Sequence, residues 1–421
     1  MAIAAESVTE VCRRARAASL ILPGVASADK DAALTVLARL LRERTAEILD
    51  ANRVDLDAGR DAGLDDALID RLRLDPDRIE AMAVGVEAVR ALDDPIGELL
   101  ERRTLESGIE MEHRRVPIGV VAIVYEARPN VTIDAAALCL KSGNAAVLRG
   151  SSSAAASNAV LVGIVKAAVA EASLPEGTVE AVAGGGREEL GELARQRDLV
   201  DLIIPRGGEG LKAALEAVAE VPILYAASGN CHVYVDAAAD LEMARGIAYN
   251  AKVQRPGVCN AAETLLVHEA VAAEFLPAAL GDLAGAGVEL IGDERVRELS
   301  GDVPVGPAAA EDWDREYHGL KLAVAVVDSA AEAIDHVNRH GSGHSEAIVT
   351  GDEAAADAFT GGVDAACVYV NASTRFTDGF EFGMGAEIGN STQKLHARGP
   401  IGLRELTSTK YVLRGTGQTR G

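Results

Sequence analysis

The residue best suited to chemistry in this chain is a cysteine in a predicted loop. Cys259 lies in the segment QRPGVCNAAETLLV, residues 254–267. Pro256 and Gly257 favour a turn there, after a helix predicted to end near Arg255. A thiol in such a loop can be exposed, and it becomes a nucleophile when positive charge or backbone N–H groups stabilise the thiolate. Arg255 or a helix terminus could do this; a buried structural thiol is the alternative.

Three turns rich in glycine or serine join predicted strands to predicted helices. They are Arg149-Gly150-Ser151-Ser152, Gly184-Gly185-Gly186 and Arg206-Gly207-Gly208. Each places backbone N–H groups at a helix N-terminus, where an anion is stabilised. Glu189 stands where a GxGxxG fingerprint needs its third glycine, so the standard dinucleotide fingerprint is absent. No carboxylate ends the strand before Gly150, which favours a phosphorylated ribose. Ordinary tight turns that exploit the backbone freedom of glycine are an equally good interpretation.

The remaining cysteines and the histidines do not suggest a metal site. Cys12, Cys139, Cys231 and Cys367 are far apart, form no CxxC pair, and are interpreted as structural. His340 and His344 have the spacing of one helix face, but the glycines between them break a helix. We therefore predict no bound metal and no disulfide framework.

The elements that must position these residues change character along the chain. The first hundred residues are predicted to be helical, because Leu34, Leu37 and Leu41 fall on one apolar face. From Val116 onward, short apolar runs alternate with helical segments, which is typical of parallel strands buried by crossover helices. The predicted strands are 119–125, 145–148, 178–182, 200–204, 221–225, 264–267, 288–291, 321–327, 347–350 and 366–370. The polar stretch 101–115 is predicted to form a hairpin. The fold class is therefore α/β, with two α/β domains.

Composition excludes several classes of protein. The chain has 421 residues, with 65 acidic and 41 basic side chains and a formal net charge of −24. This charge repels nucleic acids and disfavours a nucleic-acid-binding function. The longest apolar segment, 154–170, contains Asn158 and Lys166, and the N-terminus lacks a signal-peptide pattern. A cytoplasmic protein is the expectation.

Four long motifs resemble one enzyme family. They are VPIGVVAIVYEARPNVTIDAAALCLKSGNAAVLRGSSSA at 116–154, the Cys259 loop, HVNRHGSGHSEAIVTGD at 336–352, and VNASTRFTDGFEFGMGAEIGNSTQKLHARGP at 370–400. In this order the motifs resemble the gamma-glutamyl phosphate reductases of the aldehyde dehydrogenase superfamily, over essentially the whole chain. The resemblance implies an aldehyde dehydrogenase-like fold and NADPH-dependent formation of glutamate 5-semialdehyde from glutamyl 5-phosphate, the second step of proline biosynthesis from glutamate.

The resemblance also implies roles for individual residues. Cys259 matches the nucleophile, which forms a thioester and expels phosphate, and Asn130 matches the side chain of the oxyanion hole. A helix N-cap is an equally good reading of Asn130. Glu316 matches the glutamate that holds the nicotinamide ribose; a surface carboxylate is the alternative. Arg149 matches the basic residue near the adenosine ribose.

Further candidates surround these residues in the predicted site. Gly150, Ser151, Ser152, Arg206, Gly207 and Gly208 are predicted to contribute to NADPH binding. Arg128, Lys141, Arg375 and Arg398 are candidates for binding the substrate, and Arg206 is an alternative for either ligand. The sequence does not assign these cations to the phosphate, the carboxylate or the cofactor. Cys231 resembles a family feature and is interpreted as structural.

One departure from the wider superfamily bears on the reaction. Hydrolytic aldehyde dehydrogenases carry a glutamate general base in an ELGG motif, where this chain reads Ala226-Ala227-Ser228-Gly229. Without a carboxylate to activate water, a thioester is reduced in preference to being hydrolysed. Gly257 and Asn390 are small departures from the reductase pattern itself.

The family also predicts a domain organisation. The cofactor-binding domain is expected at 1–99 and 118–228, the catalytic domain at 229–404, and an oligomerisation hairpin and C-terminal strand at 100–117 and 405–421. The active site is expected in the cleft between the two α/β domains. A homodimer or homotetramer is expected, together with functional coupling to the kinase that makes glutamyl phosphate. A reductase or dehydrogenase of the same fold acting on another acyl phosphate or aldehyde, and a catalytically inactive scaffold, are the rival readings.

Overall fold

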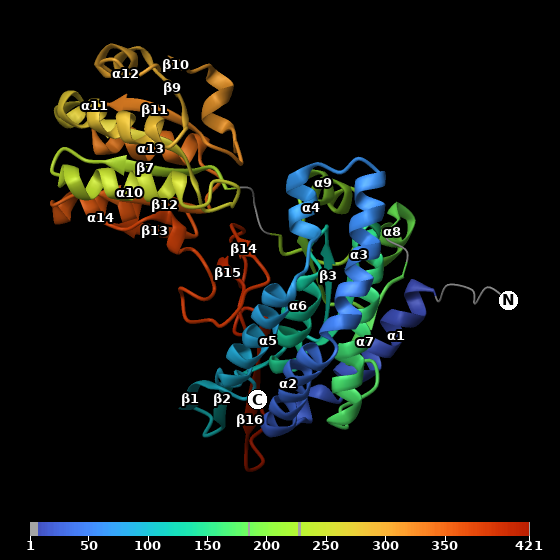
Figure 1. The fold of residues 1–421 in the computed structure, drawn as a ribbon. Helices are drawn as coiled ribbons and strands as arrows, with labels where there is room; N and C mark the ends of the chain where they lie inside the picture. Colours follow the sequence, from blue (N-terminus) through green and yellow to red (C-terminus); the bar gives the residue numbers. More distant parts are fainter. Residues whose placement is uncertain (1–6, 184–185, 226–228, 421) are drawn as a thin grey trace. The chain divides into compact units, whose positions relative to one another are not determined.

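The chain folds into two compact units. A computed structural model describes residues 7–183, 186–225 and 229–420. The first unit comprises Met1–Tyr225, Gly383–Gly389 and Ile401–Gly421, and the second comprises Ala226–Phe382 and Asn390–Pro400. Figure 1 shows the elements of both units.

The first unit begins with helices, as predicted. They are α1 (Val8–Ser19), the 3-10 turn η1 (Leu22–Gly24), α2 (Ser27–Glu43), α3 (Thr45–Asp61), α4 (Asp66–Leu72) and α5 (Pro76–Ala91). Leu34, Leu37 and Leu41 are all buried, which confirms the apolar face predicted for α2. The start of α5 is fixed by Pro76 in the first turn and by Asp75, whose side chain accepts a hydrogen bond from the backbone N–H of Arg78.

A four-stranded parallel sheet forms the centre of the first unit. Its order is β5-β4-β3-β6, with β3 (Val120–Tyr125), β4 (Ala145–Gly150), β5 (Val179–Ala181) and β6 (Leu202–Arg206). The crossovers contain α6 (Asn130–Lys141), η2 (Ser152–Ala154), α7 (Ala155–Glu171) and α8 (Arg187–Ala194), and α9 (Glu209–Glu216) follows β6. The predicted strand 221–225 is wrong: only one bridge, between Ile203 and Ile223, joins it to β6. Pro222 has no N–H to extend the pairing.

One helix of the first unit has the composition of a membrane span. Ser152–Glu171 is long and apolar enough by that measure, and 44% of its apolar window is buried inside the protein. It packs against α2, α3 and α6. These contacts make it an internal helix of the unit, in agreement with the buried Asn158 that it contains.

A separate antiparallel sheet contains the predicted hairpin. Strands β1 (Leu99–Thr104) and β2 (Glu110–Pro117) pair with each other, and β16 (Thr407–Arg414) pairs with β2. Several of its apolar side chains are exposed, namely Leu99, Leu100, Tyr411 and Leu413. The hairpin and the C-terminal strand are therefore present as predicted, and they form a single sheet.

The second unit is built on a seven-stranded parallel sheet. Its order is β10-β9-β11-β8-β7-β12-β13. The strands are β7 (Cys231–Val235), β8 (Ala262–His268), β9 (Glu289–Gly292), β10 (Gly306–Pro307), β11 (Lys321–Val327), β12 (Ser345–Val349) and β13 (Cys367–Val370). Strand β7, an internal strand between β8 and β12, was not among the predicted strands.

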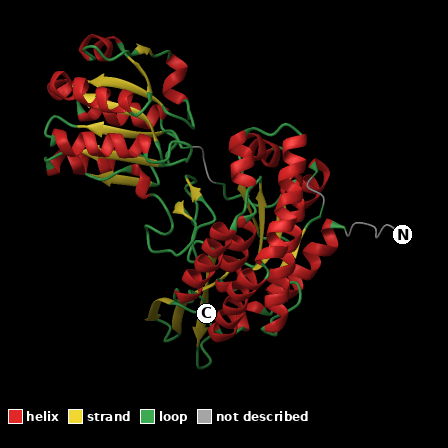
Figure 2. Cartoon of the chain, viewed as in Figure 1, coloured by secondary structure: helices red, strands yellow, loops and turns green. Residues whose placement is uncertain are grey.

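Helices cover both faces of this sheet (Figure 2). One face packs against α10 (Leu241–Val253), α11 (Glu269–Gly285) and α12 (Glu294–Leu299), and the other against α13 (Ala330–His340) and α14 (Glu353–Gly362). The 3-10 turns η3 (Ala310–Asp314) and η4 (Thr374–Phe376) and the short pair β14 (Asn390–Ser391) and β15 (Gly399–Pro400) complete the unit.

The boundary near the C-terminus differs from the predicted one. Residues 383–389 and 401–404, predicted to belong to the catalytic domain, group with the first unit. The approach of Gly385 to Ala88 and Leu92, both on or next to α5, gives a physical reason. Gly385 has φ +70°, a conformation that glycine adopts without strain.

Candidate active site

The loop that contains Cys259 connects α10 to β8 in the second unit. Cys259 is half-buried, whereas the other four cysteines of the chain are buried. Burial raises the pKa of both Cys12 and Cys139 to about 12, with Glu192 adding to the effect at Cys12. A thiol with so high a pKa remains protonated and inert near neutral pH. Cys259 is thus the thiol whose position suits a nucleophile.

Two neighbours fix the backbone of this loop. The Cys231 thiol donates a hydrogen bond to the Cys259 carbonyl oxygen, with the sulfur 3.2 Å from that oxygen. Burial raises the pKa of Cys231 well above its ordinary value, so Cys231 stays protonated and can act as a donor. Gly229 packs so closely that a Cβ atom there would overlap the Cys259 carbonyl. These contacts support the structural reading of Cys231.

The residue after the nucleophile ties the loop to η4. The Asn260 side-chain amide donates to the Thr377 carbonyl oxygen at 2.8 Å, and the Thr374 hydroxyl donates to the Asn260 carbonyl oxygen at 2.7 Å. These bonds bring Arg375, which lies on η4, into electrostatic contact with Cys259 and Arg255. The Arg375 Nε atom donates to the neutral side chain of Gln254 at 2.9 Å.

The hydrogen bond to Gln254 brings no negative charge to Arg375, so it does not neutralise the guanidinium. Burial lowers the pKa of Arg375 because it disfavours the charged form, and the nearby Arg255 lowers it further by repulsion. An anion beside Cys259 would relieve this repulsion. The structure thus places the substrate-binding candidate Arg375 beside the candidate nucleophile.

A buried ion pair lies beneath the loop that contains Glu316. Lys252 on α10 and Glu263 on β8 are both fully buried and form a short ion pair. Burial raises the pKa of Glu263 to about 7 despite the opposing effect of Lys252. The Glu263 carboxylate also accepts the backbone N–H of His318 at 3.4 Å, and the Lys252 ammonium lies 5.9 Å from the centre of the Tyr317 ring. The pair anchors the segment that follows Glu316.

Glu316 is not the surface carboxylate of the alternative reading. Its side chain is 11% exposed, and its Oε2 atom lies 3.2 Å from His318 Nε2. Its Oε1 atom is buried without a hydrogen-bond partner among the described residues. A buried acceptor in this state needs a donor, and a ribose hydroxyl is a donor of the right kind.

In the first unit, Asn130 is the first residue of α6. The N-cap position belongs to Pro129, and the helix has no side-chain cap, so the N-cap reading of Asn130 is wrong. The Asn130 amide nitrogen donates to Asp134 at 3.0 Å, one helical turn later. Burial raises the pKa of Asp134 to about 6, and the bond from Asn130 opposes this shift. The sequence analysis missed Asp134, although its i+4 spacing from Asn130 was a detectable signal.

The turn after β4 contains part of the predicted cofactor site. Arg149 is buried and donates to the Gly186 carbonyl oxygen at 2.7 Å, and its Nε atom has no hydrogen-bond partner in the described ranges. Burial lowers the pKa of its guanidinium. A Cβ atom on Gly150 would overlap the Asn158 amide, so glycine is required there by packing. Ser151 caps η2 by accepting the Ser153 N–H, and Ser152 is exposed.

Two of the helix N-termini predicted to bind anions are already occupied by carboxylates of the protein. At the start of α7, Asp55 accepts the N–H groups of Ala156 and Ser157, at 3.0 and 2.7 Å. At the start of α9, Glu126 accepts the N–H of Gly208 at 3.1 Å. Of these N–H groups only that of Gly208 belongs to a predicted turn, so the prediction of an available backbone donor is wrong at Gly208, where the chain supplies its own anion. Gly184 and Gly185 of the third turn lie outside the described residues.

Glu126 also bears on the choice of cofactor. The absence of a carboxylate at the end of β4 favoured a phosphorylated ribose, but Glu126 directly follows the neighbouring strand β3 and interacts electrostatically with Arg149. It lies against Gly207 as well, where a Cβ atom would come within 2.6 Å of its Oε2 atom. Arg206 is half-buried at the end of β6. Glu126 was missed because the prediction took only the end of β4 into account.

The other substrate-binding candidates are in different environments. Lys141 is buried and bonded to Asp31 at 2.5 Å and to the Arg90 carbonyl oxygen at 2.9 Å. Lys141 therefore has a structural role, and the prediction that it binds the substrate is wrong. Arg398 in the second unit is paired with Asp364 at 2.7 Å. Arg128 is half-buried in the segment before α6.

The histidines of the HGSGH segment have local partners. His340 Nδ1 lies 2.8 Å from Asp314, and His344 Nδ1 lies 2.8 Å from the Ser345 hydroxyl. Among the described residues, no group of three or more His, Cys, Asp or Glu side chains has a metal-binding arrangement. The absence of a metal cofactor stays a prediction. Ala226, Ala227 and Ser228, where a general base would be expected, lie outside the described residues.

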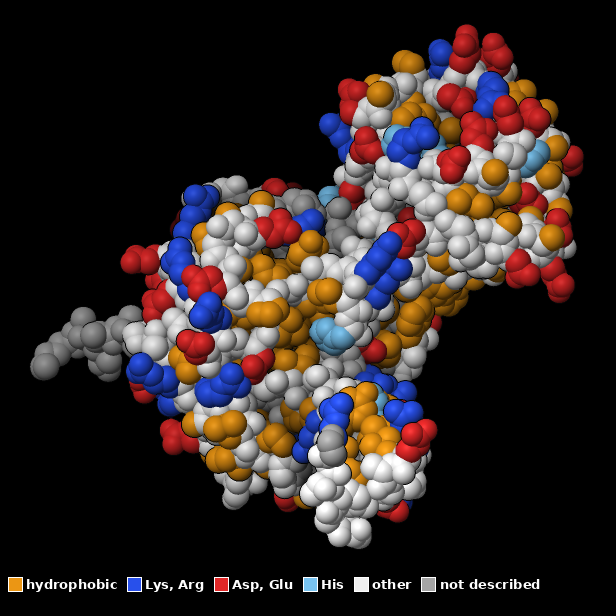
Figure 3. All heavy atoms as spheres, turned by 180° about the vertical axis from the view of Figure 1, so that it is seen from behind, with side chains coloured by type: hydrophobic (Ala, Val, Ile, Leu, Met, Phe, Trp, Pro, Cys, Tyr) orange, Lys and Arg blue, Asp and Glu red, His pale blue; other side chains and the backbone are white. Residues whose placement is uncertain are grey.

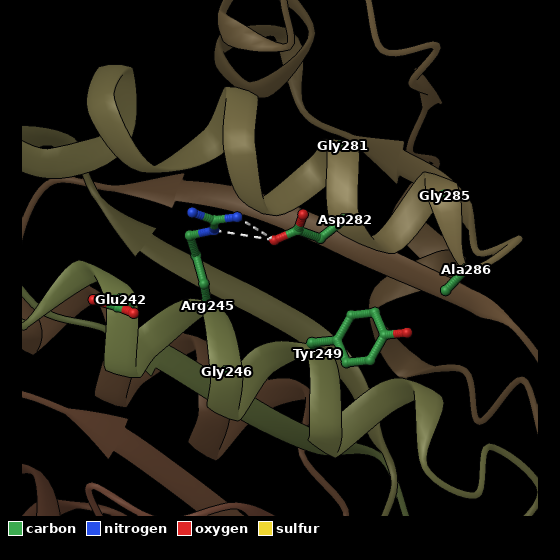
Figure 4. Close-up of a pocket in the computed structure, with 8 residues that line it drawn as sticks. All are labelled: Glu242, Arg245, Gly246, Tyr249, Gly281, Asp282, Gly285 and Ala286. Atoms are coloured by element: carbon green, nitrogen blue, oxygen red, sulfur yellow. Dashed lines mark hydrogen bonds and ion pairs between the residues drawn. The ribbon is translucent and has the colours of Figure 1, made fainter.

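One surface groove of the second unit is unrelated to these residues. It has a volume of about 680 Å³ and lies between α10 and α11, with the ion pair Arg245–Asp282 across it and with Tyr249, Gly281 and Gly285 along it (Figure 4). It contains none of the predicted site residues. On the face shown in Figure 3, acidic side chains are scattered over the second unit with few basic ones among them.

Known proteins resemble this chain along its whole length. The model of the aldehyde dehydrogenase family matches residues 1–309 and 307–412. A gamma-glutamyl phosphate reductase of Thermobifida fusca is 54% identical over 98% of both chains, and one of Syntrophomonas wolfei is 51% identical over 99% of both. The crystal structure of a gamma-glutamyl phosphate reductase of Thermotoga maritima has a TM-score of 0.96 at 45% identity, covering 99% of this chain and all of that one.

Proposed function

Because the chain belongs to the aldehyde dehydrogenase family, and within it to the gamma-glutamyl phosphate reductases, we propose that it reduces L-glutamyl 5-phosphate to L-glutamate 5-semialdehyde and phosphate with NADPH. This reaction is the second step of proline biosynthesis from glutamate. The observation that best supports it is the half-buried Cys259 in a fixed loop beside Arg375. A nucleophile next to a cation suits an anionic acyl phosphate.

In the proposed mechanism, the Cys259 thiolate attacks the acyl carbon of the substrate. The bond from this carbon to the phosphate oxygen breaks, phosphate leaves with the electron pair, and a thioester remains on Cys259. Arg375 stabilises the negative charge that gathers on the leaving phosphate. When bound, NADPH supplies the hydride that reduces the thioester. Collapse of the hemithioacetal then releases the aldehyde and regenerates the thiol.

We assign Asn130 the role of oxyanion donor. One N–H of its amide is held by Asp134, which fixes the plane of the group and leaves the second N–H for the oxyanion. A donor fixed in advance needs no reorganisation when charge develops on the substrate oxygen. The Ala226–Gly229 segment contains no glutamate, which fits an enzyme that must protect its thioester from water.

The cofactor residues are a proposal of the same kind. The buried Glu316 Oε1 atom, without a partner among the described residues, fits a ribose hydroxyl. Arg149, with Ser151 and the exposed Ser152 beside it, fits a 2′-phosphate. Arg206 completes the proposed cofactor set, whereas Gly207 and Gly208 leave it because Glu126 lies against Gly207 and accepts the Gly208 N–H. Glu126 weakens the preference for NADPH over NADH, because a carboxylate beside Arg149 repels a phosphate.

The assay that tests the proposal runs the reaction backwards. Glutamate 5-semialdehyde, phosphate and NADP⁺ should yield NADPH absorbance, and omission of phosphate should abolish it. Cys259→Ala should lower the activity about 10⁴-fold or more, while the matched variant Cys139→Ala should retain it. Activity only with an unrelated aldehyde would establish the rival reading of another substrate. Full function without Cys259 would establish a binding scaffold.

We also propose a homodimer or homotetramer that associates through the three-stranded sheet. Leu99, Leu100, Tyr411 and Leu413 are exposed apolar side chains on that sheet, and exposed apolar strands favour association. A cytoplasmic location and functional coupling to the kinase that makes glutamyl phosphate complete the proposal. Sedimentation of the full chain beside a Tyr411→Glu variant would test the interface.

A further inference from the structure

A second cavity of the catalytic unit takes no part in the proposed chemistry. Its volume is about 240 Å³, and it lies between the end of α13, the start of β12 and the segment that follows β14. Its lining includes Ser342, Glu346, Asp364, Lys394 and Arg398. This volume is several times the roughly 30 Å³ that one water occupies in the liquid, so a molecule of amino-acid size fits.

The base of the cavity contains polar atoms that lack partners. Glu346 is fully buried, and its Oε2 atom accepts the backbone N–H of His232 at 2.7 Å and lies 2.9 Å from His232 Nδ1. The Glu346 Oε1 atom and the Ser342 hydroxyl are buried with no hydrogen-bond partner in the described part of the chain. Such atoms are rare in folded proteins, because a lost hydrogen bond is not replaced by water.

Gly341 packs closely over the carboxylate, and a larger residue there would also meet the Val337 carbonyl oxygen. A Cβ atom at Gly341 would lie 3.0 Å from Glu346 Oε1. Burial raises the pKa of Glu346 well above its ordinary value, and the backbone N–H of His232 and the nearby His344 offset this only in part. A ligand cation that donates to Oε1 would supply both the missing hydrogen bond and the missing charge.

The rim of the cavity has the opposite charge. Asp364 accepts from Arg398 at 2.7 Å and from Lys394, and these two bonds lower the pKa of Asp364. One carboxylate thus faces two cations, which leaves one positive charge in excess. The guanidinium of Arg398 has further N–H groups that can donate to a ligand carboxylate.

We propose that this cavity binds an α-amino acid, with its ammonium group at Glu346 Oε1 and the Ser342 hydroxyl and its carboxylate at Arg398 and Lys394. A zwitterion matches the cavity because its carboxylate meets two cations, and because its ammonium group favours the ionised form of Glu346, whose raised pKa favours the protonated form in the empty site. Inorganic phosphate matches less well, since Glu346 and Asp364 would both oppose it. A metal cation would be repelled by Lys394 and Arg398.

Calorimetric titration of the full chain tests the site directly. L-glutamate and L-proline should bind, whereas glutarate, which lacks the ammonium group, and 4-aminobutyrate, which lacks the α-carboxylate, should bind about tenfold more weakly or worse. Ser342→Ala and Arg398→Met should each weaken L-glutamate binding about tenfold. Arg245→Met, which removes a comparable ion pair on α10, should leave it unchanged.

The variants should fold like the unaltered chain, so that a loss of binding reports on the site. The Ser342 hydroxyl bonds no described residue, so its removal should leave the melting temperature unchanged. Glu346→Gln serves as a second variant, since the amide oxygen can still accept from His232 while the carboxylate charge is lost. It should also weaken L-glutamate binding.

The amino acid could come from two sources, which kinetics separate. If it is the head group of the reductase substrate, which rests on the proposed function, Ser342→Ala should raise the KM for glutamate 5-semialdehyde at unchanged kcat, and L-glutamate should compete with the semialdehyde. If it is a free amino acid, KM should stay constant and excess semialdehyde should not reverse the effect of L-glutamate.

Failure of the site and failure of the proposed function have different signatures. The calorimetry needs no turnover, so an inactive preparation that binds L-glutamate through Ser342 supports the site alone. The inference is overturned if neither amino acid binds at millimolar concentration, if phosphate binds in their place, or if all three variants bind L-glutamate as the unaltered chain does.

Discussion

The loop around Cys259 and the glycine-rich turns of the first unit differ in the groups that bind their backbone. In the loop, the backbone is held by neutral donors, Cys231 and Thr374, and the nearby Arg375 is bonded to a neutral amide. At the turns, the helix N-termini are filled by Asp55 and Glu126. The loop therefore has a positive charge available for an incoming anion. At the turns, carboxylates of the chain already bind N–H groups at the helix N-termini.

This difference shows how well a glycine-rich turn predicts an anion-binding site. Glycine at a helix start reports a backbone conformation, because only the path of the chain requires it. Whether the exposed N–H groups are available depends on side chains that arrive from other elements. An anion site is therefore better supported by a cation beside a reactive group, as Arg375 is beside Cys259, than by a glycine-rich turn.

The largest effect is expected from breaking the buried pair beneath the Glu316 segment. Lys252→Met leaves Glu263 buried without its cation, which typically destabilises a protein by about 3–5 kcal/mol. Urea unfolding would measure it. The double variant Lys252→Met with Glu263→Gln should recover much of the loss, since no charge is then stranded. Equal stability of the single and double variants would contradict this account.

The same variant has a defined pH dependence. The pKa of Glu263 is raised to about 7 with Lys252 present, and it should rise further without that cation. A carboxyl whose folded pKa exceeds its unfolded value of about 4.3 contributes stability at low pH that is lost as pH rises through the folded pKa. The deficit of Lys252→Met should therefore be larger at pH 8 than at pH 6.

Asn130→Ala tests whether the first unit contributes to catalysis despite its filled turns. Loss of one oxyanion donor lowers kcat by about 100- to 1,000-fold, and the KM for substrate should change much less. The melting temperature should remain close to the original, because the substitution removes the bond to Asp134 within the same helix and leaves the helix backbone intact. An unchanged kcat would remove Asn130 from the mechanism.

Most of the fold follows from local pattern, and the exceptions have a common cause. The helix face of α2 and the buried strands of β3 and β4 are readable because apolar residues recur with the period of the element. Strand β7 was missed because its sequence, CHVYV, begins with polar and thiol groups that the fold buries. The segment 221–225 looked like a strand but lacks a sheet neighbour beyond one bridge.

The site residues divide in the same way. Cys259 could be singled out because Pro256 and Gly257 next to it define the turn. Lys141 resembled a free cation, and only the fold brings Asp31 to it from a distant helix. Asp134 was overlooked although it lies four residues from Asn130. Local signals therefore single out the candidate nucleophile, but they do not tell a ligand-binding cation from a buried structural one.

Gly229→Ala sharpens the comparison within the loop itself. The added Cβ atom would overlap the Cys259 carbonyl, so the loop must move, and a displacement of about 1 Å can lower turnover about 100-fold. Gly257→Ala is the matched control, because its nearest neighbour would be 3.6 Å away. Alkylation of Cys259 by iodoacetamide should change for Gly229→Ala only. Similar effects of the two variants would argue against a rigid loop.

Asp55→Ala is expected to have the smallest effect and bears most directly on the filled turns. It removes the acceptor for the Ala156 and Ser157 N–H groups and should cost about 1–2 kcal/mol of stability, as the loss of a helix cap does. Asp50→Ala on the same helix is the control, since its pair with Arg53 is exposed and contributes little. The KM for NADPH should stay the same, because the α7 amides are not part of the proposed cofactor site. A clearly tighter NADPH interaction after removal of Asp55 would show that these amides can bind an anion once their own carboxylate is gone.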